Sequence, residues 1–263
     1  MSTELILTEV REGYRSIQLN RPESLNSFNR ALHAALGAAL DAAEADKSCR
    51  ALMLTGTGRG FCAGQDLSDV DIPKDGHPDL AKTIDTNYNP LIRRLRALPM
   101  PVIAAVNGVA AGAGANIAFA CDIVLAGRSA KFIQAFSKIA LVPDSGGTWF
   151  LPRVAGSARA RALALLGEAV SAEQAEAWGM IWKVYDDASL MAEAHKLAAH
   201  LARQPTGALA LIKQALDRSE TNTLNQQLDL ERDLQGQAGR GPDFREGVAA
   251  FLEKRPAQFS GAM

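Results

Sequence analysis

The sequence predicts an α/β protein with parallel strands, followed by a helical C-terminal region. Over the first 190 residues, short β-type runs alternate with segments of helical spacing, which is typical of parallel strand pairing. After Asp187, helical segments follow one another with no strand between them. We therefore expect an α/β core over residues 1–190 and a helical region over residues 191–263.

The N-terminal part opens with a predicted hairpin, in which two strand-like runs flank Glu12-Gly13. Apolar residues at helical spacing predict helices over 25–45 and 81–98. The polar segment 68–79 contains prolines and a glycine and predicts a mobile loop. Further strands are predicted at 50–55, 101–106, 123–126 and 131–133, with a short helix at 115–120.

The C-terminal part contains four predicted helices. Pro205 is suited to the start of a helix, because its missing N–H and fixed φ angle are tolerated there. It separates the first of these helices from the second. The four helices are expected over 188–203, 206–218, 222–237 and 243–254.

Composition excludes several classes of function. The 263 residues are 48% hydrophobic and carry a net charge of −1, so no general attraction to nucleic acid or a membrane surface is expected. No signal peptide and no apolar stretch long enough to span a membrane is evident. The three cysteines lack metal-ligand spacing, so we expect no metal site and a reduced, cytoplasmic setting.

Two glycine-rich turns follow predicted strands, Gly60 to Leu67 and Asn107 to Ala115. Residues with little or no side chain let such turns present backbone N–H groups to a ligand, with support from a helix dipole. Two turns that face each other can hold one oxygen between two N–H donors. The pair therefore predicts an oxyanion hole.

Two other interpretations of short motifs are weaker. Gly58 to Ala63 loosely matches a dinucleotide-binding fingerprint, but the region about 20 residues on is a polar loop and not a strand ending in an acid. Pro143 to Gly147 resembles the stretch around a serine-protease nucleophile. That nucleophile needs a nearby histidine, and the four histidines are scattered without a strong candidate.

Asp144 lies in a turn between apolar residues, with Pro143 before it and Gly146 and Gly147 after it. A poorly solvated carboxylate has a raised pKa and becomes a better base. The alternative is that Asp144 caps the following helix. The local sequence alone favours the cap, and the two oxyanion turns shift the balance toward catalysis.

With these motifs in view, the chain resembles the crotonase superfamily, the enoyl-CoA hydratase/isomerase family, over nearly its whole length. The resemblance implies a spiral core of repeated ββα units and a C-terminal helical trimerisation region. It also implies an acyl-CoA substrate without a separate cofactor, and a homotrimer or hexamer. Association with other enzymes of a pathway is compatible with it. The resemblance rests on Leu19 to Pro22, Leu25-Asn26, both glycine-rich turns, Cys121 to Ile123, Gly146 to Thr148 and Arg245 to Val248.

The resemblance also carries site residues onto this sequence. The family's two oxyanion donors correspond to the backbone N–H groups of Gln65 and Ala113. Phe251 and Lys254 match positions that reach the CoA of a neighbouring subunit, although Lys254 is equally explained as a solvated charge at a helix end. The turn that contacts CoA corresponds to Ala63, Gln65, Asp66 and Leu67.

Hydratases of this family use two glutamates, and the corresponding positions here hold Asn116 and Phe136. Neither side chain can transfer a proton, so two-acid hydration is disfavoured and Asp144 remains as the acid/base. The family places an acid at this position in isomerases, including one that converts a ring-1,2-epoxide of phenylacetyl-CoA to an oxepin. We therefore expect an acyl-CoA isomerase of that kind, which also shifts double bonds in enoyl-CoAs.

Several alternatives remain open at this point. Asp144 is a nucleophile in the dehalogenase-like or hydrolase-like alternative, where His77 is a weak candidate for the second base. A dienoyl-CoA isomerase, a hydratase and a non-catalytic CoA-binding scaffold are the others. Phe136, Trp149 and Phe150 are suited to an aromatic acyl pocket, and core packing explains them equally well.

Overall fold

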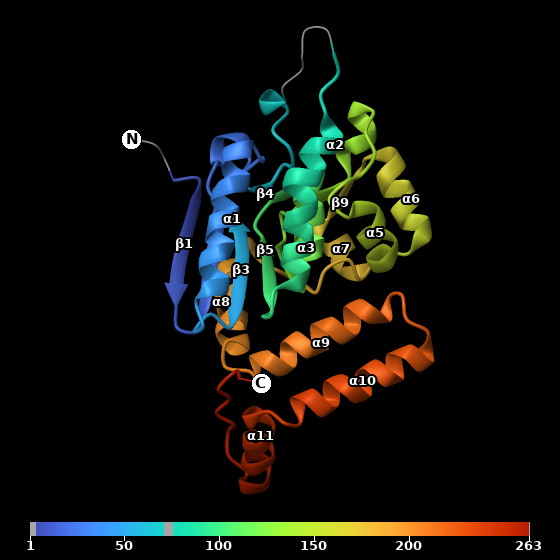
Figure 1. Ribbon diagram of the computed structural model, residues 1–263. Helices are drawn as coiled ribbons and strands as arrows, with labels where there is room; N and C mark the ends of the chain where they lie inside the picture. Colours follow the sequence, from blue (N-terminus) through green and yellow to red (C-terminus); the bar gives the residue numbers. More distant parts are fainter. Residues whose placement is uncertain (1–3, 71–75, 263) are drawn as a thin grey trace.

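Two β-sheets form the centre of the protein in a computed structural model that describes residues 4–70 and 76–262 (Figure 1). The larger sheet has six strands in the order β1-β2-β3-β5-β7-β10. Its first two strands form the predicted antiparallel hairpin, and every other pair of adjacent strands in this sheet is parallel. The strands are β1 Ile6–Arg11, β2 Tyr14–Leu19, β3 Ala51–Gly56, β5 Val102–Val106, β7 Ile123–Gly127 and β10 Lys183–Tyr185.

The second sheet has four strands in the order β4-β6-β8-β9. Along the chain, β3, β5 and β7 of the larger sheet are each followed by a strand of the smaller one. This repetition confirms the predicted α/β class with parallel pairing. The four strands of the second sheet are β4 Gly60–Cys62, β6 Val109–Ala111, β8 Lys131–Ile133 and β9 Ala169–Ser171. Of these, β4 and β6 lie within the segments predicted as turns.

Both faces of the larger sheet are covered, which explains why its central strands read as continuous apolar runs. Leu52 and Leu54 of β3 point into the main core, where they share a cluster with α1. Ala51 and Met53 point to the opposite face and pack against α8, Asp187–Leu201. The alternation of side chains along one strand thus supplies two separate cores.

The first predicted helix begins later than its spacing suggested. Helix α1 spans Arg30–Ala45, and Asn29 caps it by accepting a hydrogen bond from the Leu32 N–H. Leu25 and Asn26 have left-handed φ angles of 52° and 58°, which no helix interior tolerates. The start of the predicted helix is therefore wrong by five residues. A short 3-10 turn, Pro22–Ser24, precedes this bend.

The helix predicted over 81–98 is interrupted near its middle. It consists of α2 Leu80–Thr83, a π-helical turn Ile84–Tyr88 and α3 Asn89–Ala97. Pro90 stands at the second residue of α3, and a proline removes one backbone donor from a continuous helix. The π turn absorbs this irregularity and directs Tyr88 inward, where it is buried.

After the cores, three helices extend away from the sheets, as the lower part of Figure 1 shows. They follow α8 and, as predicted, no strand separates them. Lys213 of α9 ties this part to the sheet, since its Nζ lies 2.7 Å from an Asp122 carboxylate oxygen and donates to the Leu98 and Met100 carbonyls. These helices are α9 Thr206–Ser219, α10 Leu224–Ala238 and α11 Pro242–Glu253.

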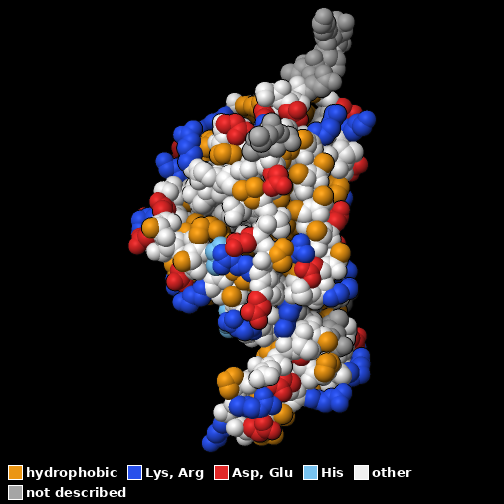
Figure 2. Space-filling view, turned by 90° about the vertical axis from the view of Figure 1, so that its left-hand side faces the viewer, with side chains coloured by type: hydrophobic (Ala, Val, Ile, Leu, Met, Phe, Trp, Pro, Cys, Tyr) orange, Lys and Arg blue, Asp and Glu red, His pale blue; other side chains and the backbone are white. Residues whose placement is uncertain are grey.

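The surface carries both signs of charge. On the face shown in Figure 2, basic and acidic side chains are interspersed over the whole height of the molecule. No helix of the described part of the chain is long and apolar enough to cross a membrane. Cys49, Cys62 and Cys121 are free and buried, and residues 4–70 and 76–262 contain no cluster of metal-binding side chains.

Candidate active site

The first glycine-rich turn pairs with the segment at Phe28 and directs the backbone N–H of Gln65 away from that segment. The N–H of Phe28 donates to the carbonyl of Gly64 at 2.7 Å, and the N–H of Asp66 donates to the carbonyl of Phe28 at 2.8 Å. In such a parallel bridge the intervening residue, Gln65, points its own N–H and carbonyl to the opposite side. Gly64 has a φ of 91°, which permits this turn without strain.

The second turn ends at the start of helix α4, Ala113–Ala120. The N–H of Ala113 belongs to the first helical residue, so it has no partner within the helix and lies at the positive end of the helix dipole. A side-chain carbon added to Gly64 would lie 3.4 Å from the Ala113 nitrogen. The two turns are therefore in contact, as the predicted pair of oxyanion donors requires.

Asp144 lies in the loop before helix α5, Gly147–Ala155, with its carboxylate half-buried. Burial raises its pKa above the usual value, and hydrogen bonds from the Ser145 hydroxyl at 2.9 Å and from its own backbone N–H partly offset that rise. No side chain caps α5, so the interpretation of Asp144 as a helix cap is wrong. The Ser145 hydroxyl donates to Asp144 and not to a histidine, which also removes Ser145 as a serine-protease-like nucleophile.

Two side chains for which no catalytic or binding role was predicted connect Asp144 to the oxyanion turns. Asn116 of α4 donates from its side-chain amide to the Asp144 main-chain carbonyl at 2.8 Å. Tyr88 donates its hydroxyl to the Gln65 side-chain carbonyl at 2.7 Å, and it lies close enough to Asp144 to interact with it electrostatically. Asp144 therefore lies near both turns, one reached through Asn116 and the other through Tyr88.

Tyr88 is held in this position by an aromatic cluster. Its ring meets His33 edge-on, with centroids 4.5 Å apart, and Phe28 lies at 6.1 Å. Burial lowers the pKa of His33 to about 4, so this imidazole is neutral at physiological pH. The only sequence signal for Tyr88 was its place in an apolar helix face, which points to packing and not to a contact with the site.

Phe136 lies against the second oxyanion turn. Its ring would be 3.6 Å from a side-chain carbon on Gly112, the residue before Ala113, and it is buried. Asn116 is also fully buried. The two positions that hold glutamates in hydratases therefore border the site with an amide and an aromatic ring, and neither supplies an acid.

The turn predicted to contact CoA is itself well supported. The Ala63 N–H donates to the Leu25 carbonyl at 2.9 Å. Asp66 accepts hydrogen bonds from Ser68 and pairs with Arg21 at 2.9 Å, and both lower the pKa of its carboxyl. Leu67 is 58% exposed at the surface, where it is accessible to a ligand. The CoA contact itself stays a prediction.

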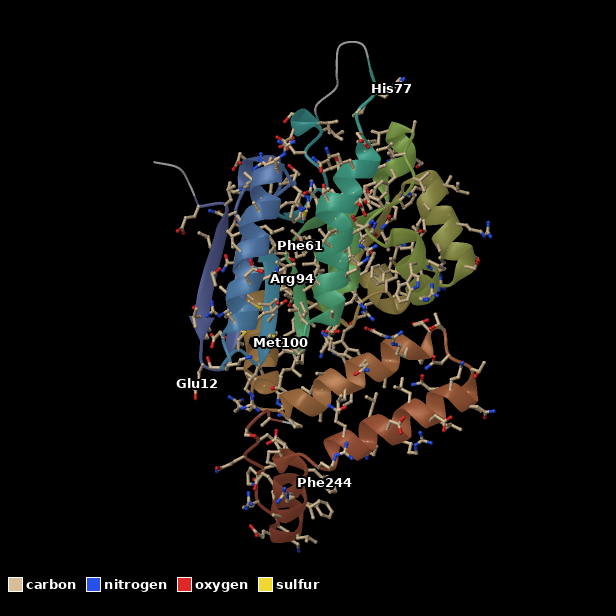
Figure 3. The ribbon with its side chains drawn as sticks, viewed as in Figure 1. Glu12, Phe61, His77, Arg94, Met100 and Phe244 are labelled. Atoms are coloured by element: carbon tan, nitrogen blue, oxygen red, sulfur yellow. The ribbon has the colours of Figure 1, made fainter. Side chains whose placement is uncertain are left out.

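Phe251 and Lys254 lie at the far end of the C-terminal helices. Phe251 is 82% exposed, and Lys254 ends α11 with an exposed side chain. Phe244 marks this helix at the bottom of Figure 3, well separated from His77 at the top. The contact of Phe251 and Lys254 with a neighbouring subunit's CoA stays a prediction.

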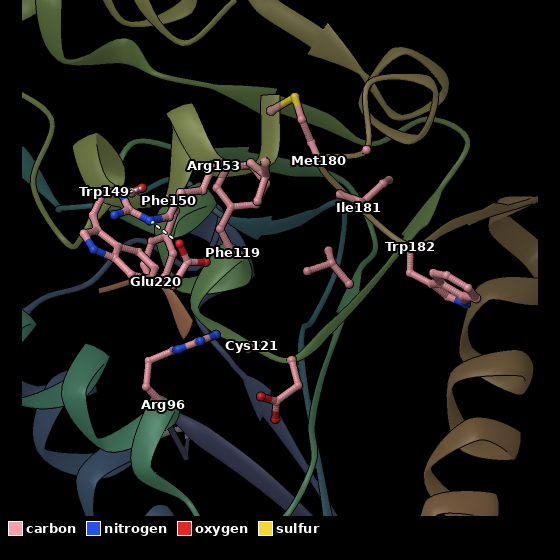
Figure 4. Close-up of a pocket in the computed structure, with 14 residues that line it drawn as sticks. Arg96, Phe119, Cys121, Trp149, Phe150, Arg153, Met180, Ile181, Trp182 and Glu220 are labelled. Atoms are coloured by element: carbon pink, nitrogen blue, oxygen red, sulfur yellow. Dashed lines mark hydrogen bonds and ion pairs between the residues drawn. The ribbon is translucent and has the colours of Figure 1, made fainter. Parts of the chain in front are cut away.

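Trp149 and Phe150 face a different cavity, of about 320 Å³, which is drawn in Figure 4. Trp149 is covered by the Arg153 guanidinium at 4.1 Å, and Arg153 in turn pairs with Glu220 at 2.9 Å. None of Asp144, Gln65, Ala113 and Phe136 lines this cavity. Of these three aromatic residues, Phe136 lies against the second oxyanion turn and Trp149 lies at the cavity of Figure 4. Phe150 lines that cavity too, but its ring is also 2.5 Å from where a side-chain carbon on Gly146, in the Asp144 loop, would lie.

Two of the alternative motifs find no support in the structure. A dinucleotide fingerprint at Gly58 to Ala63 requires a helix at its end, and strand β4 stands there instead. His77 is exposed before α2, and within the described residues no hydrogen bond or ion pair links it to Asp144. His195, by contrast, has a structural role, because its Nδ1 lies 3.0 Å from the Tyr14 hydroxyl.

Comparison with known proteins places these features in context. The model of the enoyl-CoA hydratase/isomerase family matches residues 9–262. The chain is 61% identical to 1,2-epoxyphenylacetyl-CoA isomerase of Escherichia coli K12, over 98% of this chain and 99% of that one. It is 38% identical to 2,3-dehydroadipyl-CoA hydratase of the same organism, over 98% and 99%. The crystal structure of an enoyl-CoA hydratase from Polaromonas sp. JS666 superposes with a TM-score of 0.89 at 35% identity, over 97% of this chain and 99% of that one.

Proposed function

Because the chain belongs to the enoyl-CoA hydratase/isomerase family, we propose that it is an acyl-CoA isomerase that converts 1,2-epoxyphenylacetyl-CoA to oxepin-CoA. The observation that carries the proposal is the half-buried Asp144 carboxylate beside two contacting oxyanion turns. The 61% identity to 1,2-epoxyphenylacetyl-CoA isomerase of Escherichia coli K12 supports the choice of substrate. The same site also suits a shift of a double bond in an enoyl-CoA.

The two turns would bind the thioester oxygen. As a proton leaves the carbon next to the thioester, negative charge gathers on that oxygen and the N–H groups of Gln65 and Ala113 stabilise it. Loss of one such donor costs about 3–4 kcal/mol of barrier in other enzymes. The donors act without reorganisation because α4 and the Phe28 bridge hold them in place.

Asp144 supplies the proton transfer. Its carboxylate takes a proton from one carbon of the acyl group and returns it to another, so that a single base moves the double bond and no atom is gained or lost. For the ring epoxide, the same charge stabilisation at the thioester oxygen favours opening of the strained, dearomatised ring toward the seven-membered oxepin. Phe136 then lines the acyl group.

The experiment is to incubate the purified protein with 1,2-epoxyphenylacetyl-CoA and with cis-3-enoyl-CoAs, and to identify the products by mass spectrometry. Oxepin-CoA is the expected product of the first, and 2-enoyl-CoA of the second. A product heavier by one water would indicate a hydratase, and an acyl-Asp144 adduct would indicate nucleophilic catalysis. Tight CoA binding without turnover of any ester would indicate a scaffold and would refute the proposal.

We also propose a homotrimer, alone or paired as a hexamer. Support comes from exposed apolar side chains on the C-terminal helices, a surface that is costly to leave in water. Association with other enzymes of the same pathway stays a prediction, as does the cytoplasmic setting. The exposed apolar side chains on these helices are Ile212, Leu216, Leu224, Leu228, Phe244, Val248, Phe251 and Leu252.

A further inference from the structure

A chain of two buried amides ends at the main chain of Asp144. Gln134, which is 3% exposed, donates from Nε2 to the Oδ1 of Asn116 at 2.8 Å. Asn116, which is fully buried, donates from Nδ2 to the Asp144 carbonyl at 2.8 Å. The sequence alone attributes no role to either amide.

The direction of this chain is fixed by its last member. The Asp144 carbonyl is an acceptor only, so the Asn116 amide must point its NH₂ group toward it and its oxygen toward Gln134. Gln134 must then present its own NH₂ group. This orientation leaves the Gln134 Oε1 buried and without a hydrogen-bond partner among the described residues. An unpaired buried acceptor is unfavourable, so the amide chain exists at the expense of stability.

Space as well as hydrogen bonding defines position 116. A side-chain carbon on Gly147 would lie 2.4 Å from the Asn116 Nδ2, so the loop approaches Asn116 as closely as its atoms allow. Ser145 and Gly146 have left-handed φ angles of 50° and 79°. The loop thus adopts an unusual conformation directly after Asp144, the residue to whose carbonyl Asn116 donates.

Resting on the proposed function, we infer that Asn116, oriented by Gln134, is a positioning residue that anchors the Asp144 loop and holds its carboxylate at the acyl site. The groups that face the carboxylate are the Ser145 hydroxyl, the Asp144 backbone N–H and, at longer range, the Tyr88 hydroxyl. The Asp144 carbonyl accepts one hydrogen bond from the nearby Gly147 N–H at 2.8 Å and one from Asn116, and it is the Asn116 bond that links this main chain to α4. Replacement of the hydratase glutamate by asparagine therefore exchanges a second acid for an anchor of the first.

The first test needs no substrate. The carboxyl carbon of Asp144 is titrated by carbon-13 NMR in protein labelled at aspartate, with the signal assigned from the Asp144→Asn variant. In Asn116→Ala the loop is released toward water, and we expect the pKa of Asp144 to fall toward its usual value. In Asn116→Asp a second carboxylate faces the loop, and the pKa of Asp144 rises instead.

The second test separates positioning from stability. Gln134→Leu removes the unpaired Gln134 Oε1 but leaves the Asn116 Oδ1 without its donor. Because one unpaired buried acceptor replaces another, the unfolding temperature of the variant should stay within about 2 °C of that of the wild type. Its kcat should nevertheless fall, with KM for the acyl-CoA unchanged, because Asn116 is then free to rotate. Asn116→Ala should lose at least tenfold in kcat.

Asn20→Asp is the matched control. Its side-chain amide also donates to a main-chain carbonyl, that of Glu4 at 2.7 Å, but at the end of β2. Its kcat and the titration of Asp144 should equal those of the wild type. A pKa of Asp144 that is the same in Asn116→Ala and in wild type would overturn the inference. A wild type without isomerase activity would instead refute the proposed function, while the titration still decides whether Asn116 anchors the loop.

Discussion

Replacement of Asp144 by Asn is the most direct test of the proposed chemistry. The substitution removes the ability to accept a proton and leaves the shape of the side chain unchanged. The amide oxygen still accepts the Ser145 hydroxyl, which lies at 2.9 Å in the wild type. The bond from Asn116 is untouched, because it goes to the main chain. We therefore expect a folded protein that binds acyl-CoA normally.

The size of the effect follows from the role of the carboxylate. A positioned general base contributes about 10²–10⁴-fold to a rate. Burial raises the pKa of Asp144, which makes it a stronger base than an ordinary aspartate, and among the described residues no other acid is identified at the site. We expect the upper part of that range, a loss of about 10³–10⁴ in kcat, which corresponds to about 4–5.5 kcal/mol of barrier.

The assay follows formation of oxepin-CoA from 1,2-epoxyphenylacetyl-CoA by liquid chromatography, at several substrate concentrations. Thermal unfolding of both proteins is measured in parallel. The reasoning predicts a large fall in kcat with KM and the unfolding temperature nearly unchanged. Asp144→Asn protein that keeps more than a tenth of the wild-type kcat would refute it, because no general base acts at that level after its removal.

Three further predictions concern the surroundings of the site. Ser145→Ala removes a hydrogen bond that favours the charged carboxylate, so the pKa of Asp144 rises further and the acid limb of the pH–rate profile moves to higher pH. Tyr88→Phe frees the side chain of an oxyanion residue and should lower kcat/KM by about tenfold. Lys213→Met leaves the largely buried Asp122 with the Val102 N–H but without its paired cation, and should lower the free energy of unfolding, measured in urea, by about 3 kcal/mol.

Each of these three has its own control and contrary outcome. Activity of Ser145→Ala should equal that of wild type well above the acid limb, and an unmoved limb would contradict the assignment of Asp144 as the titrating base. Tyr14→Phe removes a tyrosine hydroxyl that lies 3.0 Å from His195 and not at Gln65, and an equal kinetic loss there would contradict the role given to Tyr88. Lys196→Met removes an exposed lysine and should change the free energy of unfolding by less than about 1 kcal/mol.

The fold was predictable where local physics dominates. The β1–β2 hairpin, the central strands and the C-terminal helices follow from hydrophobic periodicity and from turn residues such as Glu12-Gly13. The start of α1 was not predictable in this way, because the left-handed conformations of Leu25 and Asn26 depend on contacts with residues distant in sequence. The Asn26 amide, for example, bonds to the carbonyls of Thr57 and Gly60.

The candidate site was predictable as a set of residue types. Two glycine-rich turns, an acid in an apolar loop, and the missing acids at Asn116 and Phe136 are all visible in the sequence. Trp149 and Phe150 show the limit of that reasoning. Their aromatic character suits an acyl pocket, but their direction in space is set by α5. Both residues line another cavity, and only the ring of Phe150 also packs against Gly146 of the Asp144 loop.

The sequence by itself determined which chemistry is available, because the presence or absence of a carboxylate at a position is a property of the chain alone. Only the tertiary structure decided how that chemistry is supported. The contact between Gly64 and Ala113, the hydroxyl of Tyr88 on Gln65 and the amide of Asn116 on Asp144 all join residues far apart in sequence. Such contacts depend on packing directions and distances, which no local pattern of residues specifies.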